Sequence, residues 1–536
     1  MRILVRCDGG PGIGVGHVVR SLALAEEAIA RGHEVALLGR LEGDLLAGLA
    51  RTVGSGLRLL DDSGPGTDDG AGLAAAAVGY DVLHVDHYEV SARPDELFEA
   101  AGGAGTVPLV SVMADGEFGA RPCDVLIDPT IGAQWKPAQA PARWHLRGAR
   151  YVPLRSDVLA RRATEPKPSE GAAARVLVVM GGVDPRACAP AVVDALAATR
   201  LDLAVTVVAT PKTRPDLERR AREEWLPGRL VVTPPLEDLP AAMAGADIVV
   251  TAAGTSVWEL CAMARPMAVV AVVDNQVPGY LALLGAGAAL GLGGPDDLTD
   301  RVKTAQRLVP LLEEPARRAA VAAAAGRLVD GLGAWRVVRA WEECHRAAPD
   351  LHQPSPAVVE VRAATLADAD VLRRWRNDPA TRASSRSHEV VSHDAHLGWL
   401  EASLTDPARR LLVGEDSGDP VGTVRWDDEG EGRWQVSITV APEMRGRGVA
   451  GPLLRAAEDW LTTELRGPVA PAPNQSRPHR IGNRRAGGEL AAYLAVVHES
   501  NSPSRRLFLR GGYLPDLPAD DLGFERYVKW VRPGPT

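Results

Sequence analysis

The amino-acid sequence predicts an α/β protein with two parallel-sheet half-domains, followed by a third α/β domain with a mixed sheet. Three observations indicate this fold class. Apolar runs of strand length alternate with helical stretches over roughly the first two thirds of the chain, which is the order that builds parallel sheets. Glycine-rich turns join strand to helix at two places in that region. After a proline-bearing segment, the pattern changes to short strands paired around a turn.

The first glycine-rich turn lies near the amino terminus. It joins a predicted strand at residues 2–6 to a predicted helix at residues 18–31, and it contains Gly14 and Gly16. A dinucleotide site would need an acid at the end of the next strand, but that strand runs into glycine and arginine at residues 39–40. The turn therefore predicts an anion site of another kind, at the start of a helix.

His17 stands where this loop becomes helix, and Arg20 follows one turn later on the same face. A histidine in that place can meet whatever the loop binds, and its ring titrates near neutral pH. His17 is therefore a candidate for proton transfer. The alternative is a histidine that only caps or packs the helix.

The second glycine-rich turn is the more informative of the two. The predicted order is strand, turn, helix and strand, at residues 247–251, 252–256, 258–264 and 267–273. Ligands of such folds lie at the carboxyl ends of the strands, and a glycine turn that opens a helix suits a diphosphate. Gly254, Thr255 and Ser256 are therefore candidates for binding a diphosphate, and Glu259 for accepting hydrogen bonds from ribose hydroxyls. The alternative is a pair of ordinary tight turns.

Six motifs occur in order across the first 344 residues. They are Gly14-x-Gly16-His17-x-x-Arg20, Asp86-His87-Tyr88, Tyr151-x-x-Leu154-Arg155, Met180-Gly181-Gly182-x-Asp184-Pro185, Ala252-Ala253-Gly254-Thr255-Ser256-x-Trp258-Glu259 and Asp274-Asn275-Gln276. Together they resemble the UDP-sugar hydrolases of the pseudaminic acid pathway, relatives of the MurG-type glycosyltransferases with the two-domain GT-B fold of Rossmann-like halves.

The resemblance implies hydrolytic release of UDP from UDP-2,4-diacetamido-2,4,6-trideoxy-β-L-altropyranose. It assigns His17 to the water and Glu259 to the UDP site. It also implies that the remaining motif residues bind UDP or the sugar: Gly14, Gly16, Arg20, Asp86, Tyr88, Gly181, Gly182, Asn275 and Gln276. One departure concerns the sugar, because the chain has Met113-Ala114-Asp115-Gly116 where the family has a paired Asp-Asp-Leu.

Length and composition agree with several domains. The chain has 536 residues, 46% of them hydrophobic, and a net charge of −9, which argues against general nucleic-acid binding. The expected divisions are two half-domains at residues 1–160 and 175–345, a linker at 346–357 and a third domain at 358–534. Five scattered cysteines without metal spacing, no signal peptide and no membrane-length apolar run predict a cytoplasmic enzyme with no metal.

The third domain has a different order of elements. Strands are expected at residues 358–364, 411–414, 421–426 and 434–440, with a helix at 367–377. The run Pro442-Glu443-Met444-Arg445-Gly446-Arg447-Gly448-Val449-Ala450 then opens a predicted helix at residues 452–465. Consecutive N–H groups at a helix start, with two arginines beside them, are suited to a pyrophosphate.

A strand at residues 491–497, a helix led by Asn501 and the pair Gly512-Tyr513 follow. This order, with its Arg-x-x-Gly-x-Ala run, resembles the GNAT acetyltransferases, which hold acetyl-CoA between two strands. Trp375-Arg376-Asn377-Asp378-Pro379 and His396-x-x-Trp399 are similar to members that act on amino sugars. The residues that the resemblance assigns to acetyl-CoA are Val440, Arg445, Gly446, Arg447, Gly448, Val449, Ala450, Asn501 and Arg505.

Direct transfer of an acetyl group to an amine needs a base for the amine and a donor for the leaving thiolate. His396, His498 and Glu499 are the candidate bases, and helix packing is the alternative role of His396. Phe508 stands where many relatives have a tyrosine, so the donor is sought at Tyr493 or in water. The proline- and arginine-rich segment 466–488 is expected to be a surface insertion, with a lid over a diphosphate as the alternative.

The combined interpretation is a bifunctional enzyme that N-acetylates a UDP-amino-sugar with acetyl-CoA and then releases UDP from the product. Two alternatives stay open. One is a glycosyltransferase fused to an acyltransferase, because a UDP site serves both reactions. The other is a nucleotide-sugar-binding module that regulates the acetyltransferase.

Overall fold

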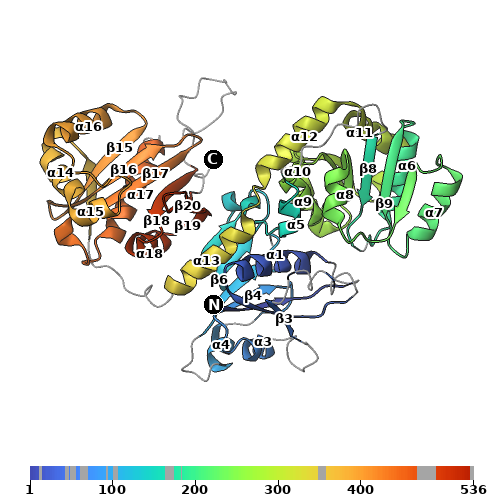
Figure 1. Ribbon diagram of the computed structural model, residues 1–536, viewed down its shortest axis with the longest axis horizontal. Coiled ribbons are helices and arrows are strands. Elements are labelled where there is room, and N and C mark those ends of the chain that lie inside the picture. Colours follow the sequence, from blue (N-terminus) through green and yellow to red (C-terminus); the bar gives the residue numbers. More distant parts are fainter. Residues whose placement is uncertain are drawn as a thin grey trace, which may run out of the picture. The chain divides into compact units, whose positions relative to one another are not determined.

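The computed structural model forms two compact units, Met1–Glu342 and Glu343–Thr536 (Figure 1), and each is described by itself. The described residues are 1–10, 15–42, 48, 53, 56–60, 70–91, 94–100, 107–116, 118–162, 174–182, 184–347, 358–466 and 491–531. Gly14 and the segments 163–173 and 467–490 lie outside them.

The first unit begins with a seven-stranded sheet in the order β3-β2-β1-β4-β5-β6-β7, with every neighbouring pair parallel. Apolar runs such as Val82–Asp86 are buried along their whole length, as expected for a parallel sheet covered on both faces. The strands are β1 (Arg2–Cys7), β2 (Glu34–Leu38), β3 (Leu57–Leu60), β4 (Val82–Asp86), β5 (Leu109–Met113), β6 (Cys123–Asp128) and β7 (Ala142–Arg147). The helices are α1 (Gly16–Ala30), α3 (Gly70–Ala76), α4 (Pro94–Ala100) and α5 (Ser156–Leu159).

A second sheet in the same unit has six parallel strands in the order β10-β9-β8-β11-β12-β13. They are β8 (Ala174–Val179), β9 (Leu203–Val208), β10 (Leu230–Thr233), β11 (Ile248–Ala252), β12 (Met267–Val270) and β13 (Leu290–Gly293). The helices are α6 (Cys188–Ala198), α7 (Arg214–Glu223), α8 (Leu239–Gly245), α9 (Ser256–Ala262), α10 (Val277–Gly285), α11 (Arg301–Glu313), α12 (Pro315–Leu328) and α13 (Gly333–Ala347).

In both sheets the strand order reverses beside the first strand, between β1 and β4 and between β8 and β11. Such a switch point leaves a crevice at the carboxyl ends of the two strands, where ligands of open α/β sheets bind. The loops that leave these strands contain the predicted site residues of the first unit.

Helix α13 joins the end of the second half to the first sheet. The Trp341 indole N–H donates to the Ser111 hydroxyl at 2.9 Å, and Ser111 contacts His84 Nδ1 at 3.1 Å. Glu342 accepts bidentate hydrogen bonds from Arg31 at 2.8 and 2.9 Å. The two halves are therefore tied by more than the segment that connects them.

The second unit has a seven-stranded sheet in the order β14-β15-β16-β17-β18-β20-β19, which is antiparallel except between β17 and β18. The strands are β14 (Glu360–Ala363), β15 (Arg409–Asp416), β16 (Asp419–Asp428), β17 (Arg433–Val440), β18 (Ala492–His498), β19 (Leu514–Leu517) and β20 (Phe524–Trp530). The helices are α14 (Ala369–Asn377), α15 (Pro379–Ala383), α16 (His393–Thr405), α17 (Ala450–Arg466) and α18 (Ser502–Arg510).

The fold class predicted from the sequence is confirmed, with corrections to single elements. The strand expected at 267–273 ends at Val270, where the chain turns toward a short 3₁₀ helix at Asp274–Gln276. The helix expected at 367–377 begins as the 3₁₀ turn Leu366–Asp368, which the Thr365–Asp368 capping box closes. Helix α13 continues to Ala347, past the expected start of the linker at residue 346.

No helix among the described residues is both long enough and apolar enough to cross a bilayer. Nor does any cluster of three or more histidine, cysteine or acidic side chains suited to a metal ion occur in the described part of the chain.

Candidate active sites

The carboxyl end of β4 and the start of α1 bring His17 and Asp86 together at the switch point of the first sheet. His17 Nδ1 lies 2.6 Å from Asp86 Oδ1. Asp86 is fully buried, and His17 is 7% exposed. Burial alone would raise the pKa of Asp86, but the Arg20 guanidinium and His17 outweigh this and hold it well below its usual range.

This geometry determines which nitrogen of His17 is available. An ionised carboxylate only accepts hydrogen bonds, so Nδ1 must be the donor to Asp86. Arg20 Nη2 also lies 3.2 Å from Nδ1, but it has a closer acceptor in Asp86 Oδ1 at 2.7 Å. The neutral ring therefore keeps a lone pair on Nε2, which is the arrangement of a general base oriented by a buried carboxylate.

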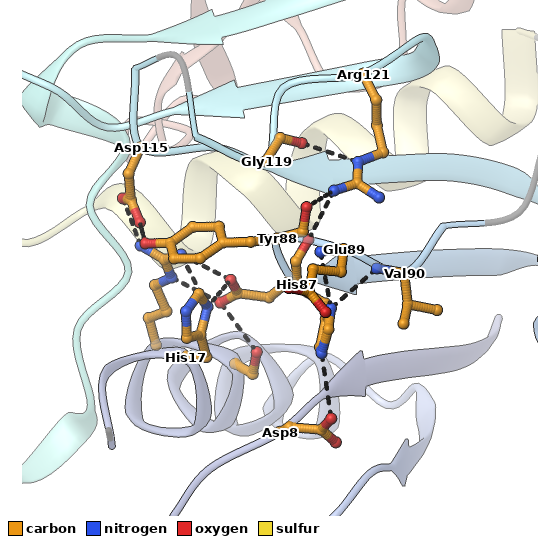
Figure 2. A network of polar contacts seen from close by, with 12 residues as sticks. Asp8, His17, His87, Tyr88, Glu89, Val90, Asp115, Gly119 and Arg121 are labelled. Carbon is orange, nitrogen blue, oxygen red and sulfur yellow. Dashed lines mark hydrogen bonds and ion pairs between the residues drawn. The ribbon is translucent and has the colours of Figure 1, made fainter. Parts of the chain in front are cut away.

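Arg20 binds two carboxylates at once. Its Nε donates to Asp86 Oδ2 and its Nη1 to Asp115 Oδ1, both at 2.6 Å. Asp115 also accepts the Tyr88 hydroxyl at 2.7 Å, and the Tyr88 ring meets that of His17 edge to face at 4.6 Å (Figure 2). Arg20, which was predicted to bind the diphosphate or the sugar, is thus held inside the site by two carboxylates. Asp115 belongs to the same site, although the sequence analysis named it only within a departure from the family pattern.

His87 fixes the turn that contains Tyr88 through hydrogen bonds. Its Nδ1 accepts the N–H groups of Glu89 and Val90, both at 3.0 Å, and its Nε2 lies 3.2 Å from Asp8 (Figure 2). Arg121 donates to the carbonyl oxygens of His87 and Tyr88. The position of the Tyr88 ring beside His17 therefore depends on a network within the first half.

The second glycine turn meets the first in this unit. A Cβ added to Gly16 would lie 2.9 Å from Thr255 Cγ2, and one added to Gly182 would lie 3.2 Å from Val15 Cγ1. A Cβ at position 16 would need a shift of the Thr255 side chain, and one at position 182 would be in tight contact with Val15. These close approaches place the start of α1, the turn after β8 and the turn after β11 around one space.

A small pocket opens there, with about 20 Å³ of space accessible to water. Its lining includes Arg20, Arg155, Thr255, Trp258 and Glu259. His17 is not in its lining but lies one turn before Arg20 on α1. Burial raises the pKa of Glu259 to about 7, against the opposing effect of Arg155.

The other predicted UDP and sugar residues lie nearby or on the rim. A Cβ on Gly254 would lie 3.6 Å from Gln276 Nε2, and Gln276 Oε1 accepts the Val272 N–H at 3.0 Å. Asn275 is exposed, Ser256 begins α9, and Gly181 has φ of 74° in an exposed turn with Gly182. Gly14 lies outside the described residues.

In the second unit, β17 and β18 separate along their length. They pair from Arg433 and Ala492 to Val436 and Ala495, and no pairing continues from there to Val440 or His498. Two parallel strands that diverge leave free backbone N–H and C=O groups facing each other, where an extended ligand can pair. This split fits the predicted place of acetyl-CoA.

The loop after β17 has the geometry of an anion-binding turn. Gly446 and Gly448 have φ of 75° and 77°, and α17 begins two residues later at Ala450. Val449 is buried in the core cluster and anchors the turn. The backbone of this turn therefore fits the predicted pyrophosphate.

The charged side chains near this turn have other partners than predicted. Arg445 donates to Asp378 and to the Thr381 hydroxyl, both at 2.7 Å, so its guanidinium ties the loop to the start of α15. Asn501 caps α18 through the Ser504 N–H, and Arg505 donates to the Glu499 carbonyl at 2.6 Å. Arg447 is exposed.

Two of the three candidate bases lie together. His498 ends β18 and Glu499 follows it, whereas His396 is 4% exposed on α16, where its ring packs on Trp399 at 5.3 Å. Tyr493 is buried and its hydroxyl contacts Thr462 and the Glu458 carbonyl, so the proposed thiolate donor faces helix α17 instead. Phe508 is buried against Tyr513.

Comparison with known proteins assigns both parts of the chain to broad classes. Residues 359–513 match the family model described as acetyltransferase (GNAT) domain. A UDP-N-acetylglucosamine–N-acetylmuramyl-(pentapeptide) pyrophosphoryl-undecaprenol N-acetylglucosamine transferase of Methylorubrum populi is 28% identical over 366 residues, 61% of this chain and 94% of the relative. The enzyme of that name from Methylorubrum extorquens is 33% identical over 190 residues, 33% of this chain and 51% of the relative.

A solved structure, spermidine N-acetyltransferase from Vibrio cholerae in complex with CoA and spermine, is 18% identical, with a TM-score of 0.26 over 32% of this chain and 95% of that one. The protein thus has a GNAT acetyltransferase domain and an amino-terminal part homologous to MurG-type glycosyltransferases.

Proposed function

We propose that the chain is a bifunctional nucleotide-sugar enzyme of the pseudaminic acid type. Its GNAT domain N-acetylates a UDP-amino-sugar with acetyl-CoA, and its amino-terminal part releases UDP from the acetylated sugar by hydrolysis. The proposal rests on one observation above the others: His17, oriented by buried Asp86, keeps a free Nε2 at the switch point of the first sheet.

In the proposed hydrolysis, His17 Nε2 takes a proton from water while the water oxygen attacks the anomeric carbon. The bond from that carbon to the diphosphate oxygen breaks, and UDP leaves with the electron pair. Asp86 stabilises the imidazolium that forms, and the Tyr88 ring limits the movement of the histidine ring.

The UDP would lie across the turn at Gly254–Ser256, with its diphosphate at the N–H groups that open α9 and its ribose hydroxyls at Glu259. Arg155 lines the same pocket and is 8% exposed, and its Nη1 lies 3.2 Å from Asp157. No described residue accepts a hydrogen bond from its buried Nε, so Arg155 is a further candidate for a phosphate oxygen. Gln276 and Asn275 would face the sugar.

One observation favours a second candidate, a glycosyltransferase that uses a UDP-sugar. The curated relatives that match the amino-terminal part are named as N-acetylglucosamine transferases, and one match extends over 94% of the relative. The same base, UDP site and switch point serve this reaction when a hydroxyl of an acceptor replaces water.

Incubation with the UDP-linked diacetamido sugar alone distinguishes the two candidates. We expect steady release of UDP and free sugar without any acceptor. A coupled assay measures the UDP, and mass spectrometry identifies the sugar. Release that stops after a fraction of a turnover, and resumes only when an acceptor is added, would instead establish the glycosyltransferase.

A further inference from the structure

The end of β18 holds a histidine whose hydrogen bonds limit what it can do. His498 is the last residue of β18 and pairs with Phe524 of β20, beyond the point where β17 and β18 separate. Its ring meets that of Phe524 edge to face at 5.1 Å. It therefore stands on the diverging part of the strand, next to the proposed place of the acetyl group.

The tautomer of His498 follows from its neighbour Ser500. The Ser500 backbone N–H donates to His498 Nδ1 at 3.2 Å, and the Ser500 hydroxyl lies 2.7 Å from the same nitrogen. A backbone N–H can only donate, so Nδ1 presents its lone pair to it. The proton of the neutral ring is then on Nε2, which makes Nε2 a donor rather than a base.

Gly523 lies beside that donor. It has φ of 80°, and a Cβ added to it would lie 3.0 Å from His498 Nε2, so a side chain at this position would crowd the nitrogen. His498 is partly exposed, and among the described residues no atom accepts a hydrogen bond from Nε2. Nε2 is therefore accessible to an acceptor atom of a ligand.

The face of the sheet indicates which ligand this is. Tyr493, Ala495 and Val497 of β18 pack in the core cluster with α17, on the side of the proposed pyrophosphate turn. His498 alternates with them and points to the opposite face. An oxygen presented on that face belongs to the acceptor sugar rather than to the cosubstrate.

We infer that His498 donates a hydrogen bond to a hydroxyl or carbonyl oxygen of the acceptor sugar, and that Glu499 is the base of acetyl transfer. The inference rests on the proposed function. Glu499 is exposed, and a Cβ added to Gly523 would lie 3.6 Å from its Cγ, so its side chain flanks the same glycine as His498. His396 is 4% exposed on α16, where its ring packs on Trp399, so it is not accessible for this role.

The Glu499 carboxylate takes one proton from the attacking amine. The new C–N bond forms at the acetyl carbonyl carbon and the C–S bond breaks, so the thiolate leaves with the electron pair and takes a proton from water. Glu499 then returns its proton to solvent. The step needs no oxidant or reductant.

Three variants test this assignment with acetyl-CoA and a panel of UDP-linked amino sugars, with thiol release as the measurement. H498A should raise KM for the acceptor about tenfold, the loss of one hydrogen bond, and leave KM for acetyl-CoA unchanged. H498Q places an amide N–H where Nε2–H stands, so it should restore most of the acceptor affinity. E499Q should lower kcat by about 10²-fold to 10⁴-fold.

The inference is overturned if H498Q and H498A both abolish kcat while E499Q keeps it, because His498 would then be the base. ¹⁵N NMR of histidine-labelled protein at pH 8, with H498Q identifying the resonance, should show the Nε2–H tautomer, and an Nδ1–H tautomer overturns the role of His498 directly. Failure to acetylate any sugar overturns the proposed function and the role of Glu499, whereas the NMR result decides His498 independently.

Discussion

Asp86 has three partners in the first site, His17, Arg20 and Ser21, and only its charged form satisfies the first two. Asparagine at this position has an NH₂ group in place of one carboxylate oxygen. That NH₂ group would face either His17 or Arg20, both of which are donors themselves. The His17 ring would then lose the partner that fixes its proton on Nδ1. The consequence should appear in the chemical step and not in the binding of UDP.

We therefore expect D86N to lower kcat for UDP release by about 10³-fold to 10⁴-fold, the range found when such an orienting carboxylate is neutralised. A coupled assay gives kcat and calorimetry gives the Kd for UDP, after circular dichroism has confirmed the fold. D115N is the matched control, because Asp115 contacts Arg20 and Tyr88 without touching His17. An equal loss in both variants would argue against a specific role for Asp86.

Ionisation of Glu259 should make the binding of UDP depend on pH. The pKa of Glu259 is about 7 because burial disfavours the charged form. Ribose hydroxyls that donate to this group favour the carboxylate, so the affinity for UDP should rise as the pH passes from about 6 to about 8. The stability of the free protein changes in the opposite direction. Because burial raises the pKa of Glu259, the protein loses stability as the pH rises from the ordinary pKa of a glutamate toward 7.

Calorimetry with UDP at several pH values checks this expectation. E259Q cannot ionise, so its remaining pH dependence reports only the diphosphate and the other groups. The difference between the two proteins isolates Glu259. Identical slopes would mean that Glu259 does not meet the ribose.

Single residues show what sequence reasoning can reach. His17, Gly254 and Glu259 follow from residue type at a strand-to-helix turn. The structure places Glu259 in the lining of the pocket, Gly254 next to the lining residue Thr255, and His17 one turn before the lining residue Arg20. Asp115 was noticed only as a departure from a family pattern, although an acid after an apolar strand is itself a signal. Arg20 and Arg445 were expected to bind ligand, but their partners Asp86, Asp115 and Asp378 come from distant segments that no local pattern reveals.

At the scale of elements, the two glycine turns depend on each other. A Cβ added to Gly16 would crowd Thr255 of the other half, and one added to Gly182 would lie close to Val15. The alternation of apolar and helical segments was sufficient to predict the parallel sheets. The separation of β17 from β18 was not predictable from either strand alone, since it depends on where the pairing between distant segments stops.

The turn before α17 provides a test at this scale. Arg445 holds the turn through Asp378, so R445A should weaken acetyl-CoA binding about tenfold by loosening the loop rather than by removing a contact to phosphate. D378N should reproduce most of that loss, and the double variant should be no worse than R445A. Calorimetry with acetyl-CoA measures all three.

R447A is the comparison variant, because Arg447 lies in the same turn, is exposed and was predicted to bind the pyrophosphate itself, so its loss should add to that of D378N. Additive losses in R445A and D378N would show that Arg445 contacts the cosubstrate directly. The Kd for UDP should stay the same in every one of these variants, as they alter the second unit alone.

At the scale of the whole molecule, the first unit contains two sheets and the second unit one, and each unit has its own cores. Within the first unit, Trp341 and Glu342 of α13 bind the first sheet and its neighbouring helix, so both halves of the UDP site belong to one folded body. The acetyl-transfer site is built entirely from residues of the second unit. The described residues of the two sites share no element.

This division predicts that the two activities can be removed separately. H17A takes away the proposed base of the first unit, so UDP release should fall to background while acetyl transfer to a UDP-amino-sugar keeps its kcat. E499Q should do the reverse. The two activities of each variant are assayed separately, acetyl transfer with the UDP-amino-sugar and UDP release with the already acetylated UDP-sugar, because loss of acetylation would otherwise remove the substrate of the second reaction. Thermal unfolding confirms that both units stay folded. If either substitution lowered both activities equally, the two reactions would depend on one site, and the assignment of one reaction to each unit would have to be abandoned.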